Sequence, residues 1–139
     1  MPTPRRPRIL RPFGGAILAL ALVLGTSGSA RAGFDEGWTA YQKADFGAAL
    51  KHWQPLAEEG DRRAQYNLGV LFDEGKGVRQ DRDQAIDWWR KSAAQRFGPA
   101  QHNLANLHIA GDGVARDFEQ ALGLLRQAAG QGLARSQYT

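Results

Sequence analysis

The sequence predicts an all-α protein, folded as a short right-handed superhelical solenoid of antiparallel helix pairs. The main observation is an internal repeat of 36 residues, because residues 64–99 align with residues 100–135 without a gap and share 14 identical positions. Within each copy, apolar residues recur at helical spacing and a glycine pair separates the two helices. A single helix pair cannot bury both of its faces, so neighbouring pairs must stack.

Residues 1–32 have the three parts of a secretory signal peptide: an arginine-rich start, the apolar stretch AILALALVLG and the small-residue exit Ala30-Arg31-Ala32. Ten helical residues extend about 15 Å, whereas the hydrocarbon core of a bilayer is about 30 Å thick. We therefore expect cleavage after Ala32, a periplasmic or secreted mature protein and no stable membrane insertion. An uncleaved anchor from Phe13 to about Ala30 is the alternative.

The basic charge of the chain is concentrated in this leader. The whole sequence carries a formal net charge of +4, but residues 1–32 hold five arginines and no acidic residue, which leaves 13 basic groups against 14 acidic ones in residues 33–139. A chain with this balance has no electrostatic footprint for a phosphate backbone, so we expect no nucleic-acid partner. The absence of cysteine means that packing alone must stabilise the fold.

The predicted repeat domain covers residues 33–139. It divides into an N-terminal capping hairpin at 33–63, two full repeats at 64–99 and 100–135, and the stub of a further helix at 136–139. The capping hairpin lacks the glycine loop and is expected to turn more tightly, like a 34-residue tetratricopeptide hairpin. We expect five helices before the stub.

Each full repeat carries start and stop signals for its helices. Gly75 is expected to end the first helix, and Gly77 frees the next turn for an unusual backbone angle. Asp81 is a good N-cap for the second helix, and Gln84, three residues later, completes a capping box. Asp117 and Gln120 repeat this arrangement. Trp53 and Trp89 occupy the same predicted core position, and Leu125 takes it in the last repeat.

These residues carry a resemblance to a known family. The segment AQYNLGVLFDEGKGV, with the QD, WW and alanine positions that follow it, resembles the Sel-like repeat family, a branch of the tetratricopeptide-type α-solenoids. The resemblance covers roughly residues 34–138 and weakens in the later copy, where Ala105, His108 and Leu124-Leu125 replace the more typical residues. It implies a scaffold for protein–protein interaction, often at the cell envelope, with a groove lined by the first helix of each repeat.

The candidate partner-binding groove is a set of recurring polar and aromatic positions: Gln65, Tyr66, Asn67, Gln101, Asn103 and Trp88. Asparagine is a poor helix former, yet it recurs in the middle of the first helix of both full repeats. Its amide either bonds a neighbouring helix or holds the backbone of a bound peptide, and the glutamines have the same ambiguity. Trp88 points about 100° away from Trp89, so it either packs between repeats or anchors a partner. Trp38 is expected to seal the N-terminal end.

No motif predicts catalysis, a cofactor or a metal. The glycine loops lack the spacing of a P-loop, and His102 and His108 do not share a helix face. We therefore expect a non-catalytic scaffold with a protein or peptide partner. The alternatives are an envelope enzyme acting on peptidoglycan or β-lactams, and a carbohydrate-binding factor that uses Trp88 as a stacking platform.

The last predicted helix has an apolar face with no obvious unit beyond it. This face consists of Ala121, Leu122, Leu124, Leu125 and Ala128. Stacked repeats normally end in a polar cap, so the sequence predicts that self-association or another partner buries the face, or that the chain is a shortened form of a longer ancestor.

Overall fold

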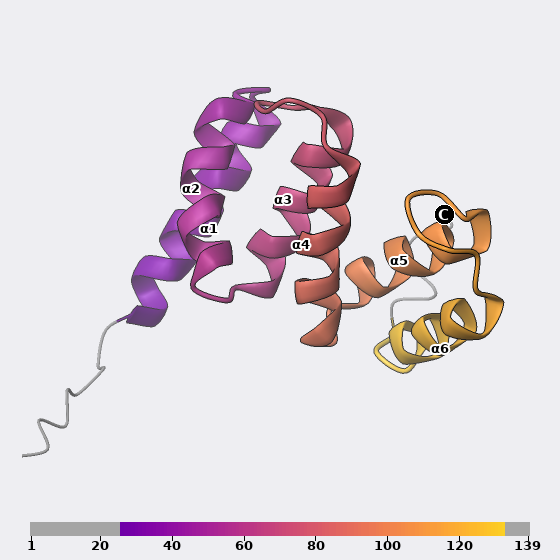
Figure 1. The fold of residues 1–139 in the computed structure, drawn as a ribbon. Helices are drawn as coiled ribbons and strands as arrows, with labels where there is room; N and C mark the ends of the chain where they lie inside the picture. The colour runs from indigo at the N-terminus through magenta and orange to yellow at the C-terminus, as the bar shows by residue number, and fades with distance from the viewer. Residues whose placement is uncertain (1–25, 133–139) are drawn as a thin grey trace, which may run out of the picture.

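The computed structural model describes residues 26–132, which form six α-helices in three antiparallel hairpins (Figure 1). The helices are α1 (Thr26–Gln42), α2 (Phe46–Glu58), α3 (Arg62–Glu74), α4 (Arg82–Ala94), α5 (Gly98–Ala110) and α6 (Phe118–Ala129). The predicted all-α repeat solenoid is confirmed. The predicted number of five helices is wrong, because the capping unit and both full repeats each form a complete helix pair. The stub at 136–139 lies outside the described residues.

Each helix packs on the next one along the chain, so the core continues from the inside of each hairpin to the interface with the next. One buried cluster is shared by α2 and α3, and the other by α4 and α5. The second helix of a hairpin therefore buries its apolar stripe against the first helix of the hairpin that follows. This arrangement is the stacking that a repeat with too little core of its own requires.

The predicted end of the leader falls inside α1. This helix begins at Thr26, so it continues across the expected cleavage position after Ala32. Ala30 packs against the first core cluster, whereas Arg31 and Ala32 are exposed. Within residues 26–132, no helix has both the length and the apolar character needed to cross a membrane. Cleavage and the boundary of the repeat domain remain predictions.

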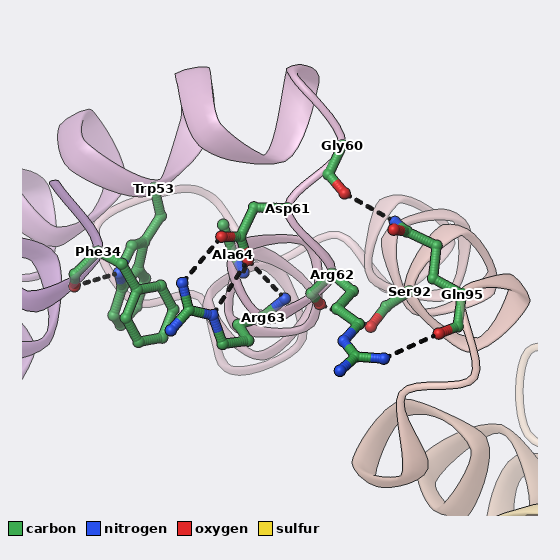
Figure 2. Close-up of polar contacts among 9 residues, drawn as sticks. All are labelled: Phe34, Trp53, Gly60, Asp61, Arg62, Arg63, Ala64, Ser92 and Gln95. Atoms are coloured by element: carbon green, nitrogen blue, oxygen red, sulfur yellow. Dashed lines mark hydrogen bonds and ion pairs between the residues drawn. The ribbon is translucent and has the colours of Figure 1, made fainter. Parts of the chain in front are cut away.

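The first two hairpins are each built around one buried tryptophan, as the sequence predicts. Trp53 is 1% exposed and Trp89 is 3% exposed. The indole Nε1 of Trp53 donates a hydrogen bond to the backbone oxygen of Phe34 at 3.2 Å (Figure 2), and that of Trp89 donates to the oxygen of Tyr66 at 3.1 Å. These bonds satisfy the only polar atom of each buried ring, so the tryptophan fills the hairpin without an unpaired donor.

A glycine on the first helix makes room for each tryptophan. A Cβ atom at Gly37 would overlap the Trp53 indole, and one at Gly69 would overlap the Trp89 indole. Since these two glycines are 32 residues apart while the tryptophans are 36 apart, the first hairpin lacks four residues of the turn between its helices. This shorter turn confirms the tighter connection predicted for the capping hairpin.

The glycine loops and helix caps form as predicted. Gly75 and Gly111 end α3 and α5 in the left-handed conformation, with φ of 65° and 68°. The carboxylate of Asp81 accepts a hydrogen bond from the Gln84 backbone N–H at 3.0 Å, and Asp117 accepts the equivalent bond from Gln120 at 2.9 Å. The Gln84 side chain donates to the Asp81 carboxylate at 3.2 Å, while the Asp81 backbone N–H donates to the Phe72 carbonyl, so the N-cap forms but the reciprocal bond of the predicted capping box does not.

Polar contacts fasten the end of α4 to the turn between α2 and α3 (Figure 2). The Gln95 side-chain amide donates to the carbonyl of Gly60 at 2.8 Å, and Arg62 donates to the carbonyl of Gln95 at 3.2 Å. The hydroxyl of the fully buried Ser92 donates to the carbonyl of Arg62 at 2.7 Å. The carbonyls of Gly60 and Gln95 lie just beyond the ends of α2 and α4 and lack an intrahelical partner, so these bonds satisfy them and join the end of α4 to the turn before α3.

Asp61 is the N-cap of α3, and its replacement tests how much this junction depends on charge. Its carboxylate accepts hydrogen bonds from the backbone N–H groups of Arg63 at 2.8 Å and Ala64 at 3.1 Å, and pairs with the Arg63 guanidinium at 3.0 Å (Figure 2). Burial raises the pKa of Asp61, but these donors outweigh it and hold the pKa below its ordinary value of 3.8. The stabilisation is therefore present above that value and is lost as pH falls through the lowered pKa.

We expect Asp61→Ala to lower the free energy of unfolding by about 1 kcal/mol at pH 7. The loss should be smaller at an acidic pH below 3.8, because the stabilisation by the wild-type carboxylate is lost as pH falls through its lowered pKa. Urea unfolding at both pH values measures the difference. Asp61→Asn is the matched control, since its side chain keeps an acceptor without the charge. Its free energy of unfolding at pH 7 should lie between those of the unmodified chain and Asp61→Ala. An equal loss at both pH values would mean that the cap does not act through its charge.

Candidate partner-binding site

A cavity of about 190 Å³ lies between the first helices of the first two hairpins. Its lining residues are Trp38 and Tyr41 on α1, Trp53 on α2, and Tyr66, Asn67 and Val70 on α3. The sequence analysis places Tyr66 and Asn67 in a groove on the first helices, and both residues line this cavity. The cavity combines aromatic surface with one side-chain amide, which is the composition of a site that binds an apolar group and fixes its orientation.

The α1 wall is an aromatic pair held in place by the core. The rings of Trp38 and Tyr41 stack with centroids 5.7 Å apart and an interplanar angle of 12°, and the Tyr41 ring also lies 5.7 Å from the buried Trp53 ring. Trp38 nevertheless remains 46% exposed. A large ring that is exposed but positioned by its neighbours loses little conformational entropy when it contacts a partner.

The prediction that Trp38 seals the N-terminal end is wrong. The outward face of α1 carries Glu36 and Thr39, which are exposed. With the 32-residue spacing of the first hairpin, these residues stand where α3 has the buried Leu68 and Leu71. This side of α1 is therefore polar, and Trp38 lies instead on the side of α1 that lines the cavity.

Tyr66 and Asn103 connect α3 to α5. Burial raises the pKa of the Tyr66 hydroxyl, and a hydrogen bond with the Asn103 side chain opposes that rise. The Tyr66 ring also meets the edge of Phe97, with centroids 5.6 Å apart. Asn103 thus has a structural partner, whereas Asn67 lines the cavity itself. The two equivalent asparagines, which the sequence treats alike, have different surroundings.

The structure removes Gln65 and Gln101 from the predicted groove. Gln65 is 5% exposed and Gln101 is fully buried. The amide of Gln65 donates to the carbonyl of Ala57 at 3.1 Å, and that of Gln101 donates to the Gln127 side chain at 2.9 Å. Each amide oxygen accepts from a further glutamine, Gln95 or Gln131. These hydrogen bonds join neighbouring helices, so the two buried amides serve the packing of the repeats and do not line a groove.

Trp88 also lies outside the cavity. It is half-buried and packs against the first core cluster, which supports the alternative in which it packs between repeats. The Lys91 ammonium lies 4.1 Å from the centre of its ring. A ring covered on one face by the core and contacted by a cation has little surface left for stacking on a sugar, so the structure does not favour the carbohydrate platform.

The histidines and acidic residues form no evident chemical site. His108 is buried, with its Nδ1 at 3.0 Å from the carbonyl oxygen of Ala115, so it acts as a packing residue that satisfies a loop carbonyl. Within residues 26–132, no group of three histidine, cysteine, aspartate or glutamate side chains is placed to hold a metal ion. The candidate site is therefore the aromatic cavity.

Sequence reasoning did not identify Tyr41 and Val70 as cavity residues and gave Trp38 another role. The available signal was the spacing of Trp38 and Tyr41, which are three residues apart and therefore share a helix face. That spacing does not show which neighbour the shared face of α1 meets, because this depends on the register between α1 and α3. The register follows from the four-residue shortening of the first turn, and the packing of Trp53 against Gly37 fixes it.

The comparisons with known proteins agree with this architecture. The sequence model of the Sel1 repeat family matches residues 30–61, 62–97 and 98–133. The first match includes the capping hairpin, which is therefore a shortened Sel1 repeat. No curated protein matches the chain.

Two solved structures are similar to the chain. One is a protective antigen present in uropathogenic Escherichia coli strains and displaying an SLR fold, with 30% identity and a TM-score of 0.68 over 77% of this chain and 24% of that one. The other is a Sel1 repeat protein from Oxalobacter formigenes, with 27% identity and a TM-score of 0.66 over 78% of this chain and 44% of that one. The chain thus spans less than half the length of either.

Sel1 repeat proteins are generally scaffolds for protein interaction, and the repeat is typically non-catalytic. The three matched segments run without interruption from residue 30 to residue 133. The chain therefore belongs to the Sel1 repeat family.

Proposed function

We propose that this protein is an exported scaffold of the bacterial cell envelope that binds a segment of a partner protein in the cavity between α1 and α3. The observation that carries the proposal is the composition of the cavity, in which the exposed Trp38 and the Asn67 amide border one apolar space. The envelope location rests on residues 1–32, which have the character of a secretory signal.

The lining residues suit a peptide more than a small polar molecule. Tryptophan and tyrosine are enriched among residues that dominate binding energy, because they bury a large area at low entropic cost. The cavity volume of about 190 Å³ suits one large apolar side chain. The Asn67 amide has both a donor and an acceptor, so it can pair with one peptide unit of an extended backbone beside that side chain.

This proposal predicts separate effects of the cavity residues on binding and on folding. Peptides selected from a random display library on the full chain should carry a large apolar residue flanked by an extended segment. Trp38→Ala should weaken the selected peptides at least tenfold, which corresponds to about 1.4 kcal/mol or more. Asn67→Ala should weaken them several-fold. Fluorescence anisotropy of labelled peptides measures both constants.

Two variants serve as comparisons. Asp83→Ala changes an exposed residue on α4, outside the cavity, and should leave the binding constant unchanged. Asn103→Ala removes the bond to Tyr66, so it should lower thermal stability more than Asn67→Ala does. Selected peptides that bind Trp38→Ala and Asn67→Ala as tightly as the unmodified chain would exclude this cavity as the site.

A further inference from the structure

Within residues 26–132, most of the exposed large hydrophobic side chains lie on the last two helices. Among the described residues, the exposed large hydrophobic side chains are Trp38, Ile109, Phe118 and Leu122. Trp38 belongs to the cavity. The other three, which we call the end patch, lie on α5 and α6, and their exposed fractions are 40% for Ile109, 61% for Phe118 and 41% for Leu122. Large apolar side chains left exposed on neighbouring helices are the kind of surface that proteins use for interaction.

In the first hairpin, the position equivalent to the end patch is covered by the glycine loop of the next hairpin. The Tyr41 and Phe46 rings meet edge to face, with centroids 5.3 Å apart. The Lys76 ammonium lies 3.3 Å from the Tyr41 hydroxyl and 5.1 Å from the centre of the Phe46 ring. The adjacent Gly77 is so close that a Cβ atom would lie 2.7 Å from the Phe46 carbonyl carbon.

In the second hairpin, the equivalent position is also covered by the next glycine loop, but the contacts are ion pairs. Asp73 and Arg82 form an ion pair, and Asp112 of the next glycine loop pairs with Arg82 at 2.9 Å. A Cβ atom at Gly113 would lie 2.7 Å from the Ile86 side chain. The residue between the two glycines therefore matches the chemistry of the hairpin before it: a cation meets an aromatic pair, and an anion meets an arginine.

In the third hairpin, the equivalent pair is apolar. Ile109 and Phe118 stand 36 residues after Asp73 and Arg82, and Leu122 stands 36 residues after the buried Ile86. A hydrogen bond from the Asp117 N–H to the His108 carbonyl, 3.0 Å long, holds the start of α6 against the end of α5. Ile109 and Phe118 offer neither the hydroxyl that Tyr41 presents to Lys76 nor the guanidinium that Arg82 presents to Asp112, so the polar contacts of the first two hairpins have no counterpart here.

Head-to-tail stacking of copies is therefore disfavoured. The first hairpin also lacks a glycine loop, and its outward face carries Glu36 and Thr39. Three of the four exposed large hydrophobic side chains of residues 26–132 belong to the end patch, so within the described part of the chain the apolar surface that can match it is the same patch on another copy. Such a contact is self-complementary around a two-fold axis, which is the commonest symmetry of protein dimers.

We propose that the end patch binds a second copy of this chain, with α6 of one copy antiparallel to α6 of the other. The α6 stripe Phe118, Leu122, Leu125 and Ala129 has the spacing of one helix face. Glu119 and Arg126 are exposed and border this stripe two turns apart. In an antiparallel pair centred between residues 122 and 123, Glu119 of each copy faces Arg126 of the other.

Sedimentation equilibrium of the full chain tests the proposal. The unmodified chain should form dimers in a concentration-dependent way. Leu122→Gln should raise the dimer dissociation constant at least tenfold. Because the Leu122 side chain is 41% exposed, the far-ultraviolet circular dichroism of the Leu122→Gln chain should match that of the unmodified chain. Asp87→Lys, a change of an exposed charge on α4, is the control and should leave the constant unchanged.

A charge swap tests the antiparallel orientation. Glu119→Arg and Arg126→Glu should each weaken the dimer, since each places like charges opposite one another at two symmetric positions. The double variant should restore the dissociation constant of the unmodified chain. An unmodified chain that remains a monomer at the highest soluble concentration would overturn the proposal. The proposal would equally be overturned if Leu122→Gln associates as tightly as the unmodified chain. It would also be overturned if the two single charge variants weaken the dimer and the double variant does not restore it.

Discussion

Replacing Gly69 by alanine is expected to lower the free energy of unfolding by about 2–3 kcal/mol, near the upper end of the usual cost of overpacking a core. The added Cβ would overlap the indole nitrogen of Trp89. Trp89 is 3% exposed and is held by its hydrogen bond to the Tyr66 carbonyl, so it has little space into which to move. Chemical denaturation followed by circular dichroism measures the loss.

The third hairpin provides the compensating change. Ala105 stands there in place of Gly69, and Leu125 stands in place of Trp89. Trp89→Leu in the Gly69→Ala background should therefore recover part of the lost stability, although Trp89→Leu alone leaves a cavity and destabilises. We expect a favourable coupling energy of at least about 1 kcal/mol in the double-mutant cycle. Strictly additive losses would mean that the two positions do not contact each other in the way described.

Trp53→Ala is expected to have the largest effect of any single substitution discussed, a loss of about 3–5 kcal/mol. The Trp53 ring fills the first hairpin, lies 6.0 Å from the Phe34 ring, and is 1% exposed. The change also leaves the Phe34 carbonyl without its side-chain donor. Small domains are stable by only about 5–15 kcal/mol. The unfolding transition of the variant should therefore lose much of its cooperativity, or shift to a much lower temperature and urea concentration. Thermal and urea unfolding both report this.

Trp38→Ala is the matched control for that experiment, because it removes the same side chain from an exposed position. It should cost no more than about 1 kcal/mol, mainly from its stacking on Tyr41. The pair of variants separates the tryptophan that stabilises the fold from the one proposed to bind a partner. A loss of stability in Trp38→Ala as large as that in Trp53→Ala would contradict this assignment.

The repeat made most of the fold predictable. The ungapped alignment of residues 64–99 with 100–135 gives the element boundaries, and Gly75, Gly111, Asp81 and Asp117 act where local backbone geometry requires them. Such signals are local, since a left-handed helix end or an N-cap depends on the residue and its immediate neighbours. The core tryptophans were predictable for a related reason, because a position that repeats at the same register repeats its burial.

The candidate site was only partly predictable. Gln65 and Asn67 both recur in the next repeat, but they lie two residues apart on one helix, about 200° around its axis, so helical spacing already indicates that they face different sides. The packing of α3 against its neighbours decides which side is buried: the Gln65 amide donates to the Ala57 carbonyl near the end of α2, whereas Asn67 lines the cavity. The aromatic wall of α1 was missed because the first hairpin departs from the 36-residue period.

The sequence by itself determined the helical repeat, its period, its caps and the apolar character of the last helix, because each follows from local spacing and residue type. Only the tertiary structure decided which recurring residues line the cavity, and which loop residue meets which pair in the hairpin before it. Those relations join residues about 30 positions apart, as in the contact of Lys76 with Tyr41 and of Asp112 with Arg82. They depend on how one hairpin packs against the next, which no local pattern encodes.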